Sequence, residues 1–410
     1  MSNPRILQIV HDHPAFTSGG TEWIAHDLTT ELRRLGAAAR LVAASTSLSR
    51  PEAAPGALEA FGEDFLLRTG AYDAFSMTRD DGPTWVASLS RVLADVRPDL
   101  VHLHGLDRIG ADVVHTIRAH RPRARIVMTL HDYQSICARD GLMVTQDGAL
   151  CHGATPGRCR TCLPQLSVAR HALREARLKS VLSEIDLFIA PSQFLKTRYM
   201  AWGLDESRIA IVPNGVPAAQ GCPPVRGDRF AFFGNLAEHK GIYVLLDAAA
   251  RIARRGGTLR IAIHGGFTWA AEAERRRFTE AVERAAPVAH HHGPYDRSDL
   301  AGLMAQADWV VVPSTWWENA PLVILEAQRA GRPVICTGIG GMAESVTHGV
   351  TGLHVPRGDP AALAETIEAA AADAALCRRL FMNIRPPDDV ATMARAHLCH
   401  YRRLLEKVPA

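Results

Sequence analysis

Two series of alternating segments constrain the fold of this chain more than any other feature of its sequence. In each series, short apolar runs such as residues 5–10 (RILQIV) alternate with amphipathic segments such as residues 22–35. This alternation is typical of a parallel sheet covered by helices. Residues 217–228 (PAAQGCPPVRGD) separate the two series, and their Pro and Gly favour a loop. We therefore predict an α/β protein with two doubly wound, Rossmann-like domains that face each other across a cleft.

The predicted elements follow this alternation along the chain. Strands are expected at residues 5–10, 40–44, 99–104, 125–130, 186–190, 208–212, 229–233, 259–264, 289–292, 308–312 and 333–336. Helices are expected at residues 22–35, 168–182, 241–255, 272–284, 298–307 and 389–406, and from Pro321 onward. Residues 51–83 are rich in Pro, Gly and Asp, and we predict that they form an irregular surface excursion at the mouth of the cleft.

Composition narrows the class of protein. A chain of 410 residues is long enough for two domains of ordinary size. The net charge of +3 is too weak for the electrostatic field of a nucleic-acid-binding protein. No apolar run reaches the roughly 18 residues that a membrane span needs. The first residues lead directly into a predicted strand without a signal peptide, so we expect a cytoplasmic protein.

Residues 316–327 (WWENAPLVILEA) are the segment most informative about function, because two glutamates stand in an otherwise apolar run. A predicted strand precedes them, so Glu318 falls in a loop, and Pro321 suits the first position of a helix. The backbone N–H groups of Leu322 and Val323 would then form an anion site at the positive end of that helix. Open α/β sheets bind their ligands at this carboxyl edge.

The two glutamates of this segment, Glu318 and Glu326, match the paired-glutamate motif of a known enzyme family. The chain resembles the retaining glycosyltransferases of family 4 (glycosyl transferases group 1), which have the GT-B fold. Further motifs follow in the family's order over nearly the whole chain: Gly19-Gly20-Thr21-Glu22, Thr129-Leu130-His131-Asp132, Ala190-Pro191-Ser192, Val212-Pro213-Asn214-Gly215-Val216, Phe233-Gly234-Asn235, His239-Lys240-Gly241, Gly340-Gly341 and Thr351-Gly352-Leu353.

This resemblance implies an organisation in three parts. Residues 1–220 would form an acceptor-binding domain that carries a Cys-rich insertion at 137–162. Residues 221–385 would bind the nucleotide sugar, for which UDP- or GDP-sugars are the expected donors. A helix within residues 386–410 would cross back to the N-terminal domain, as the last helix does in the family.

The resemblance also assigns parts of the donor to particular residues. Lys240 would supply positive charge to the diphosphate, together with the N–H groups at Leu322 and Val323. Glu326 would accept hydrogen bonds from the ribose, and Glu318 would contact hydroxyls of the transferred sugar. The neighbours of Glu318 in the motif, Asn319 and Ala320, are assigned to the same donor site.

Two further positions concern the diphosphate. Gly19 and Gly20 would let the backbone approach the phosphates closely, although an ordinary turn is the alternative reading. The family usually has Arg directly after the glycine where this chain has Asn235, which removes one cation from the expected clamp. His239 or an arginine from elsewhere would compensate for this loss.

The resemblance implies transfer with retention at the anomeric carbon and without an enzymic nucleophile. The leaving diphosphate oxygen would help to deprotonate the acceptor, while the protein orients the substrates and stabilises the leaving group. No metal is expected, because Lys240 and the helix dipole supply positive charge and the sequence has no Asp-x-Asp motif. The expected catalytic residues are His131, Glu318 and Lys240.

His131 ends a predicted strand and would touch the donor sugar or the reacting centre, although a structural strand-end histidine is the alternative. Among the other histidines, His104 is a weaker candidate for the cleft, and His11 and His13 are weaker again. The run at residues 290–292 resembles a metal tract, but adjacent strand residues point to opposite faces, so strand packing is preferred there.

Four cysteines, Cys137, Cys151, Cys159 and Cys162, lie within one irregular stretch, and the last two form a C-x2-C unit. Four thiols in one insertion of an intracellular protein favour a structural zinc site. Disulfides and free thiols are the alternatives. His152 could replace one thiolate. No cofactor is expected for catalysis itself.

Residues 168–182 (VARHALREARLKSVL) predict a basic amphipathic helix, which is either a solvated face or a peripheral contact with the inner face of a membrane. The expected function is therefore transfer of a sugar to a glycan, lipid-linked or small-molecule acceptor in polysaccharide or glycoconjugate biosynthesis. A GT-B phosphorylase or epimerase would need residue patterns that the sequence lacks. A catalytically weak nucleotide-sugar-binding protein of the same fold is the alternative, and Asn235 is the feature that favours it.

Overall fold

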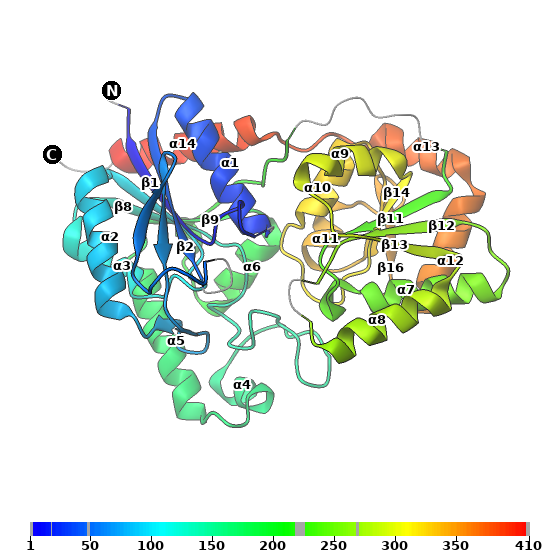
Figure 1. Cartoon of the computed structure of the whole chain (residues 1–410), viewed down its shortest axis with the longest axis horizontal. Helices are drawn as coiled ribbons and strands as arrows, with labels where there is room; N and C mark the ends of the chain where they lie inside the picture. Colours follow the sequence, from blue (N-terminus) through cyan, green and yellow to red (C-terminus); the bar gives the residue numbers. More distant parts are fainter. Residues whose placement is uncertain (1–2, 18, 47–49, 218–225, 268–269, 407–410) are drawn as a thin grey trace. The chain divides into compact units, whose positions relative to one another are not determined.

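The computed structural model describes residues 3–17, 19–46, 50–217, 226–267 and 270–406. The chain divides into two compact units. Unit 1 contains the described residues up to Gly215 and from Val390 onward, and unit 2 is Val216–Asp389. Helix α14 (Val390–Glu406) thus belongs to unit 1, where it packs against α1 (Gly20–Arg34) (Figure 1). Most of the predicted linker, residues 218–225, lies outside the described residues.

Unit 1 is built on an eight-stranded sheet with the order β10-β9-β8-β7-β1-β2-β4-β3, in which only β3 and β4 pair antiparallel. Its strands are β1 (Arg5–His11), β2 (Ala38–Ser45), β3 (Leu58–Phe61), β4 (Asp64–Arg68), β7 (Leu100–His104), β8 (Arg125–Thr129), β9 (Leu187–Ala190) and β10 (Ile209–Ile211). Its other helices are α2 (Gly82–Val96), α3 (Val113–His120), α4 (Pro156–Cys162), α5 (Val168–Ser183) and α6 (Gln193–Trp202). The fully buried central strand β7 is apolar except for its histidines, as expected of a sheet covered on both faces.

The interpretation of residues 51–83 as irregular is wrong. Strand β4 pairs parallel with β2 and antiparallel with β3, so this segment extends the sheet of unit 1. A second small hairpin joins β5 (Tyr72–Asp73) and β6 (Thr78–Arg79). Neighbouring Pro and Gly hid the short apolar run of β4, which forms a hairpin with β3 and lies beside β2.

Unit 2 contains a six-stranded, fully parallel sheet with the order β13-β12-β11-β14-β15-β16. Its strands are β11 (Arg229–Phe233), β12 (Arg260–His264), β13 (Ala289–Gly293), β14 (Trp309–Val312), β15 (Val334–Thr337) and β16 (Gly352–Val355). Its helices are α7 (Ile242–Arg254), α8 (Glu272–Ala285), α9 (Arg297–Gln306), α10 (Leu322–Arg329), α11 (Gly340–Ser345), α12 (Pro360–Ala372) and α13 (Ala374–Asn383).

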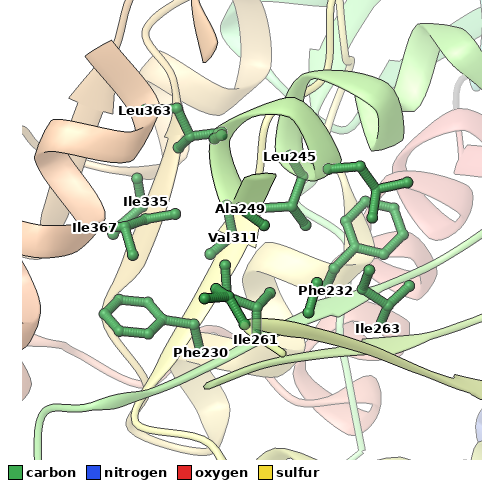
Figure 2. Packing of buried hydrophobic residues seen from close by; sticks show 14 of the residues in the cluster. Phe230, Phe232, Leu245, Ala249, Ile261, Ile263, Val311, Ile335, Leu363 and Ile367 are labelled. Atoms are coloured by element: carbon green, nitrogen blue, oxygen red, sulfur yellow. The ribbon is translucent and has the colours of Figure 1, made fainter. Parts of the chain in front are cut away.

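Side chains of β11 alternate between two cores, one on each face of this sheet. Phe230 and Phe232 pack with residues of α7 and α12, as Figure 2 shows, and with residues of α8. Ala231 and Phe233 pack on the opposite face with residues of α9, α10 and α11. This two-residue period is that of a strand buried on both sides. The prediction of an α/β protein with two Rossmann-like parallel sheets is confirmed.

Each sheet has one point at which the order of its strands reverses. In unit 2 the chain runs from β11 outward through β12 and β13, then returns to place β14 on the other side of β11. In unit 1 the reversal lies between β1 and β7. The loops that leave neighbouring strands diverge at such points and leave a crevice that open α/β sheets use for ligands. Among the described residues, no helix is both long and apolar enough to cross a membrane.

A buried carboxylate fixes the entry of the chain into unit 2. The side chain of Asp308, which is fully buried, accepts hydrogen bonds from the backbone N–H groups of Arg226, Asp228 and Arg229. The Arg229 guanidinium binds the same carboxylate at 2.8 Å. Burial alone would raise the pKa of Asp308, but these donors outweigh burial and hold the pKa at about 2. The carboxylate therefore stays ionised and ties the first strand of unit 2 to β14.

We predict that Asp308→Ala lowers the free energy of unfolding of unit 2 by about 1–3 kcal/mol, because it leaves several backbone N–H groups without an acceptor. Urea denaturation followed by Trp fluorescence measures the change. Glu280→Ala is the matched control, since Glu280 makes only an exposed ion pair with Arg276 at 3.7 Å. The control should change stability by less than about 0.5 kcal/mol. Equal effects of the two substitutions would contradict the anchoring role of Asp308.

Candidate functional site

The centre of the candidate site in unit 2 is an ion pair across the point of strand reversal. Lys240 follows β11 and Glu318 follows β14, and the Lys240 Nζ lies 2.8 Å from the Glu318 Oε1. Ser314 Oγ donates to the same oxygen at 2.8 Å. Glu318 is only 5% exposed. Burial would raise its pKa, but the charge of Lys240 and the hydrogen bonds lower it, so Glu318 is an anion at neutral pH.

Backbone geometry holds the two partners at this distance. Gly241, directly after Lys240, has φ +75°, and a Cβ at this position would lie 1.9 Å from the carbonyl oxygen of Pro313. Only glycine allows this close passage between the loops after β11 and β14. On the other side, the Gly341 N–H donates to the Glu318 carbonyl oxygen at 2.8 Å. The motifs around Lys240 and Gly341 thus clamp the loop that carries Glu318.

Two aromatic rings and one arginine surround the ion pair. The Lys240 Nζ lies 5.1 Å from the centre of the Trp316 ring, and the His239 ring packs edge-on against Trp316. Burial and the charge of Lys240 lower the pKa of His239 to about 4, so His239 is neutral at pH 7. Arg357 donates from Nε to the Thr315 carbonyl oxygen at 2.5 Å and brings a second cation to this loop.

Helix α10 begins one residue later than the sequence predicts. Pro321 is the cap residue with φ −66° and ψ 118°, and Leu322 is the first helical residue. Leu322 and Val323 are half-buried in the first turn, and Glu326 is half-buried one turn further along. The structure therefore keeps the N–H groups of this turn at the carboxyl edge of the sheet. Asn319 and Ala320 lie, half-buried, in the loop that leads from Glu318 to the helix.

A cluster of aromatic side chains lies at the ends of β11, β12 and β13. His264 stacks on Phe233 at 5.0 Å and on His292 at 4.9 Å between ring centres. Tyr295 packs edge-on against Phe233 at 5.8 Å. Burial and the charge of Glu326 raise the pKa of Tyr295, which places Glu326 beside this cluster.

Asn235 lies at the same edge, in the turn that follows β11. Its side chain is exposed, while its carbonyl oxygen accepts from the Ala237 N–H at 2.9 Å. The preceding residue, Gly234, donates from its N–H to the His264 carbonyl oxygen at 3.1 Å. Asn235 thus stands on a turn that backbone hydrogen bonds fix.

His131 belongs to unit 1, where it follows β8 as predicted. Its Nε2 lies 3.0 Å from Nδ1 of His104, and the two rings stack. Burial and neighbouring histidines lower the pKa of His131 to about 3, so the ring is neutral at pH 7. Burial raises the pKa of the next residue, Asp132, to about 6. The hydroxyl of Tyr199 donates to the Asp132 carbonyl oxygen at 2.9 Å and holds this turn.

Gly19 and Gly20 also belong to unit 1, at the start of α1. A Cβ at Gly19 would lie 2.2 Å from a carboxylate oxygen of Glu22. Glu22 accepts a hydrogen bond from Thr17 at 3.0 Å and is 6% exposed. A side chain at position 19 would therefore require the Glu22 carboxylate to move.

The four clustered cysteines line one cavity of about 210 Å³ next to α4. All four are half-buried, and none of them belongs to a disulfide. Burial raises the pKa of Cys159 to about 11, with the neighbouring thiols as a further cause. Among the described residues, no group of three or more His, Cys, Asp or Glu side chains is already placed to hold a metal ion. The structure thus brings the thiols to one cavity without joining them by disulfides.

Sequence reasoning missed Ser314, Arg357 and Tyr295. Ser314 stands four residues before Glu318 at the end of a strand, and this position could have identified it. Arg357 and Tyr295 follow other strands, so only the order of the strands in the sheet brings them to this edge. The two central residues that the sequence did predict, Lys240 and Glu318, are brought together.

Two family models match the chain. The model described as Glycosyltransferase Family 4 matches residues 18–220, and the model described as Glycosyl transferases group 1 matches residues 227–373. Together they cover most of both units.

Relatives and solved structures agree with these matches. A D-inositol 3-phosphate glycosyltransferase of Paenarthrobacter aurescens is 30% identical over 210 residues, which are 48% of this chain and 48% of that protein. The match thus spans about half the length of that relative. A glycogen synthase of Mycobacterium tuberculosis is 27% identical over 393 residues, which are 92% of this chain and 88% of that protein.

The fold has solved counterparts. The structure of HepE from Anabaena, described as a complex with UDP and glucose, matches with a TM-score of 0.71 and 19% identity. The match covers 99% of this chain and 100% of that one. The two sheets, the paired loops after β11 and β14, and the matching models lead to one conclusion: the chain belongs to the family 4, group 1 glycosyltransferases of the GT-B fold.

Proposed function

We propose that this protein transfers a sugar from a nucleotide sugar, UDP- or GDP-linked, to an acceptor hydroxyl, with retention at the anomeric carbon and without a catalytic metal ion. The observation that carries this proposal is the Lys240–Glu318 ion pair at the strand reversal of unit 2. An ammonium group has three donors, and Glu318 occupies only one of them. The others can meet the oxygens of a diphosphate.

The two sides of this pair support different parts of the donor. Lys240 and the first turn of α10 together supply a cation and backbone N–H donors for the leaving diphosphate. Glu318 is ionised and acceptor-only, so it suits the hydroxyl groups of the transferred sugar. Because Lys240 provides the positive charge, the proposal needs no metal ion at this place.

Glu326 and the aromatic cluster support the nucleoside. A carboxylate half-buried beside Tyr295 suits the two hydroxyls of a ribose. His292 is exposed and stacks on His264, which offers a flat ring next to that carboxylate. We propose that the base lies against this cluster. The HepE structure, with its bound UDP and glucose, shows that this fold accommodates such ligands in a relative.

The proposed acceptor is a glycan, a lipid-linked glycan or a small molecule with a free hydroxyl, in polysaccharide or glycoconjugate biosynthesis. Helix α5 offers less support for membrane contact than its composition predicts. Arg174 is buried and donates to the carbonyl oxygens of Phe75, Gln134 and Ser135. Arg177 donates to the Ser76 carbonyl oxygen. Half of the basic residues of α5 therefore stabilise loops of unit 1, which favours an acceptor that is bound from solution.

We predict that one of the nucleotides UDP, GDP, ADP and dTDP raises the melting temperature of the protein. The sugar derivative of the same nucleotide, tested separately, should also raise it. A ligand at a hundred times its dissociation constant stabilises by about 2.7 kcal/mol. Glu326→Ala should weaken this stabilisation strongly, because it removes the proposed ribose acceptor. Glu365→Ala, on the exposed side of α12, is the matched control and should leave the shift unchanged. No shift with any nucleotide would contradict the proposal and favour a disabled donor site.

The role of Lys240 is tested with a pair of variants. Lys240→Met leaves Glu318 buried without its cation, so both folding and transfer should suffer. The double variant Lys240→Met/Glu318→Gln removes both charges and should recover thermal stability, while kcat stays lower by about 10²–10³-fold. Product formation by NMR reports the rate and the anomeric configuration. Normal transfer by the double variant, or an inverted product from the unmodified protein, would contradict the proposal.

We also propose that the four-cysteine cavity binds a structural zinc ion. Four thiols at one cavity match the ligand number and type that zinc prefers. The surrounding segment needs such a cross-link, because α4 has no buried residue of its own. The thiols would have to close around the ion, since they are not yet at coordinating positions. Zinc would then act on folding and would take no part in transfer.

Elemental analysis of the purified protein should find about one zinc ion per chain. The double variant Cys159→Ser/Cys162→Ser should lose the ion and melt at a lower temperature. Cys399→Ser is the control, because Cys399 is exposed on α14 and distant in sequence from the cavity. A metal-free protein whose melting temperature does not change in the double variant would show that the thiols are simply free.

A further inference from the structure

A line of buried polar side chains crosses the carboxyl edge of the sheet in unit 1. Gln8 lies on β1, His104 ends β7 and His131 follows β8, so the line passes the strand reversal between β1 and β7. Gln8 and His104 are fully buried. Polar groups in such a place are expected to be hydrogen-bonded, and Gln8 Oε1, both ring nitrogens of His104 and Nε2 of His131 are.

The hydrogen bonds have a defined sequence. Gln8 Oε1 lies 2.8 Å from Nε2 of His104, and Nδ1 of His104 lies 3.0 Å from Nε2 of His131. The His104 and His131 rings stack with their centres 5.3 Å apart. We infer that Gln8 and His104 are positioning residues that hold the proton of His131 on Nε2, so that Nδ1 of His131 acts only as a hydrogen-bond acceptor.

The donor and acceptor in each of these hydrogen bonds follow from the side-chain amide of Gln8. An amide oxygen can only accept, so Nε2 of His104 must carry a proton. A neutral imidazole has one N–H and one bare nitrogen, so Nδ1 of His104 accepts and Nε2 of His131 donates. One amide on β1 therefore determines the tautomer of a ring two strands away.

The argument requires both rings to be neutral. Burial is the main cause that lowers the pKa of each ring, to about 3 for His131 and well below the ordinary value for His104. The charged forms would also repel neighbouring imidazoles from three elements: His11 on β1, His102 on β7 and His397 on α14. A neutral His131 is thus maintained through the whole physiological range.

A neighbouring histidine, His102, has other hydrogen-bond partners, one of which, Tyr401, also contacts the Gln8 side chain. Nδ1 of His102 meets the hydroxyl of Tyr401 at 2.5 Å, and its Nε2 meets Oγ1 of Thr129 at 2.7 Å. Both nitrogens of His102 are occupied, so His102 does not compete for His104 or His131. This second line provides a control within the same buried cluster.

The tautomer limits what His131 can recognise. Any group that Nδ1 meets must donate a hydrogen bond, as a sugar or acceptor hydroxyl does. A phosphate oxygen or a carbonyl oxygen would face a lone pair instead. This consequence rests on the proposed function, because it supposes that His131 meets a substrate. The tautomer therefore assigns Nδ1 of His131 to the recognition of a hydroxyl group. Because this nitrogen carries no proton, it cannot protonate the leaving group.

The test is nitrogen NMR of the full chain labelled with ¹⁵N-histidine, with the His131 signals assigned from a His131→Asn spectrum. We expect the proton on Nε2, a bare Nδ1, and no titration between pH 8 and pH 5. In Gln8→Leu, His104 loses its fixed acceptor, so His131 should show both tautomers. Thr129→Val removes only the His102 line and should leave the His131 spectrum unchanged.

A proton on Nδ1 of His131 in the unmodified protein would overturn the inference, as would an unchanged tautomer in Gln8→Leu. If Gln8→Leu does not fold, the position of the proton in the unmodified protein still decides the question. The spectra are recorded without substrate and need no transfer. If NMR shows the other tautomer of His131, the inference fails but the proposed function is unaffected. If the expected tautomer is found but the protein transfers no sugar, the proposed function fails but the inference about the tautomer is unaffected.

Discussion

The contact between Lys240 and Glu318 is the interaction on which the arrangement of unit 2 depends. A buried carboxylate is stable only with a close cation and further donors, and here it has both Lys240 and Ser314. Meeting this requirement fixes the loops after β11 and β14 to each other. The glycines at positions 241 and 341 let the backbones pass closely enough for the contact to form. The Lys240–Glu318 ion pair and the close packing of the backbone thus require the same arrangement of the loops after β11 and β14.

Buried polar groups also organise unit 1, but by a different means. Its centre holds neutral imidazoles in place of an ion pair, and hydrogen bonds to Gln8, Thr129 and Tyr401 keep them ordered. Burial keeps these rings uncharged, whereas Lys240 keeps Glu318 charged. The two units therefore differ in their central groups, which are neutral imidazoles in unit 1 and an ion pair in unit 2.

The sequence predicted most of the fold because parallel strands buried on both faces leave continuous apolar runs, as in β14. It failed at β3 and β4, where Pro and Gly around a short apolar run indicated an irregular segment. For the site, local motifs identified Lys240 and Glu318, but Tyr295 and Arg357 reach the same edge only through the order of strands. The basic residue Arg174 shows the opposite error, since composition predicted a surface charge and the structure buries it against backbone carbonyls.

The place of α14 has a consequence for synthesis of the chain. Unit 2 is one continuous segment, whereas unit 1 needs α14, whose Tyr401 hydroxyl binds the buried His102. On the ribosome, the N-terminal unit therefore cannot complete its core until the last helix has emerged, after all of unit 2. Unit 2, which is synthesised later, can therefore fold first. Unit 1 is synthesised earlier but lacks α14 beside α1 until synthesis reaches that helix. Shortening the chain at its C-terminus would thus harm the unit made first.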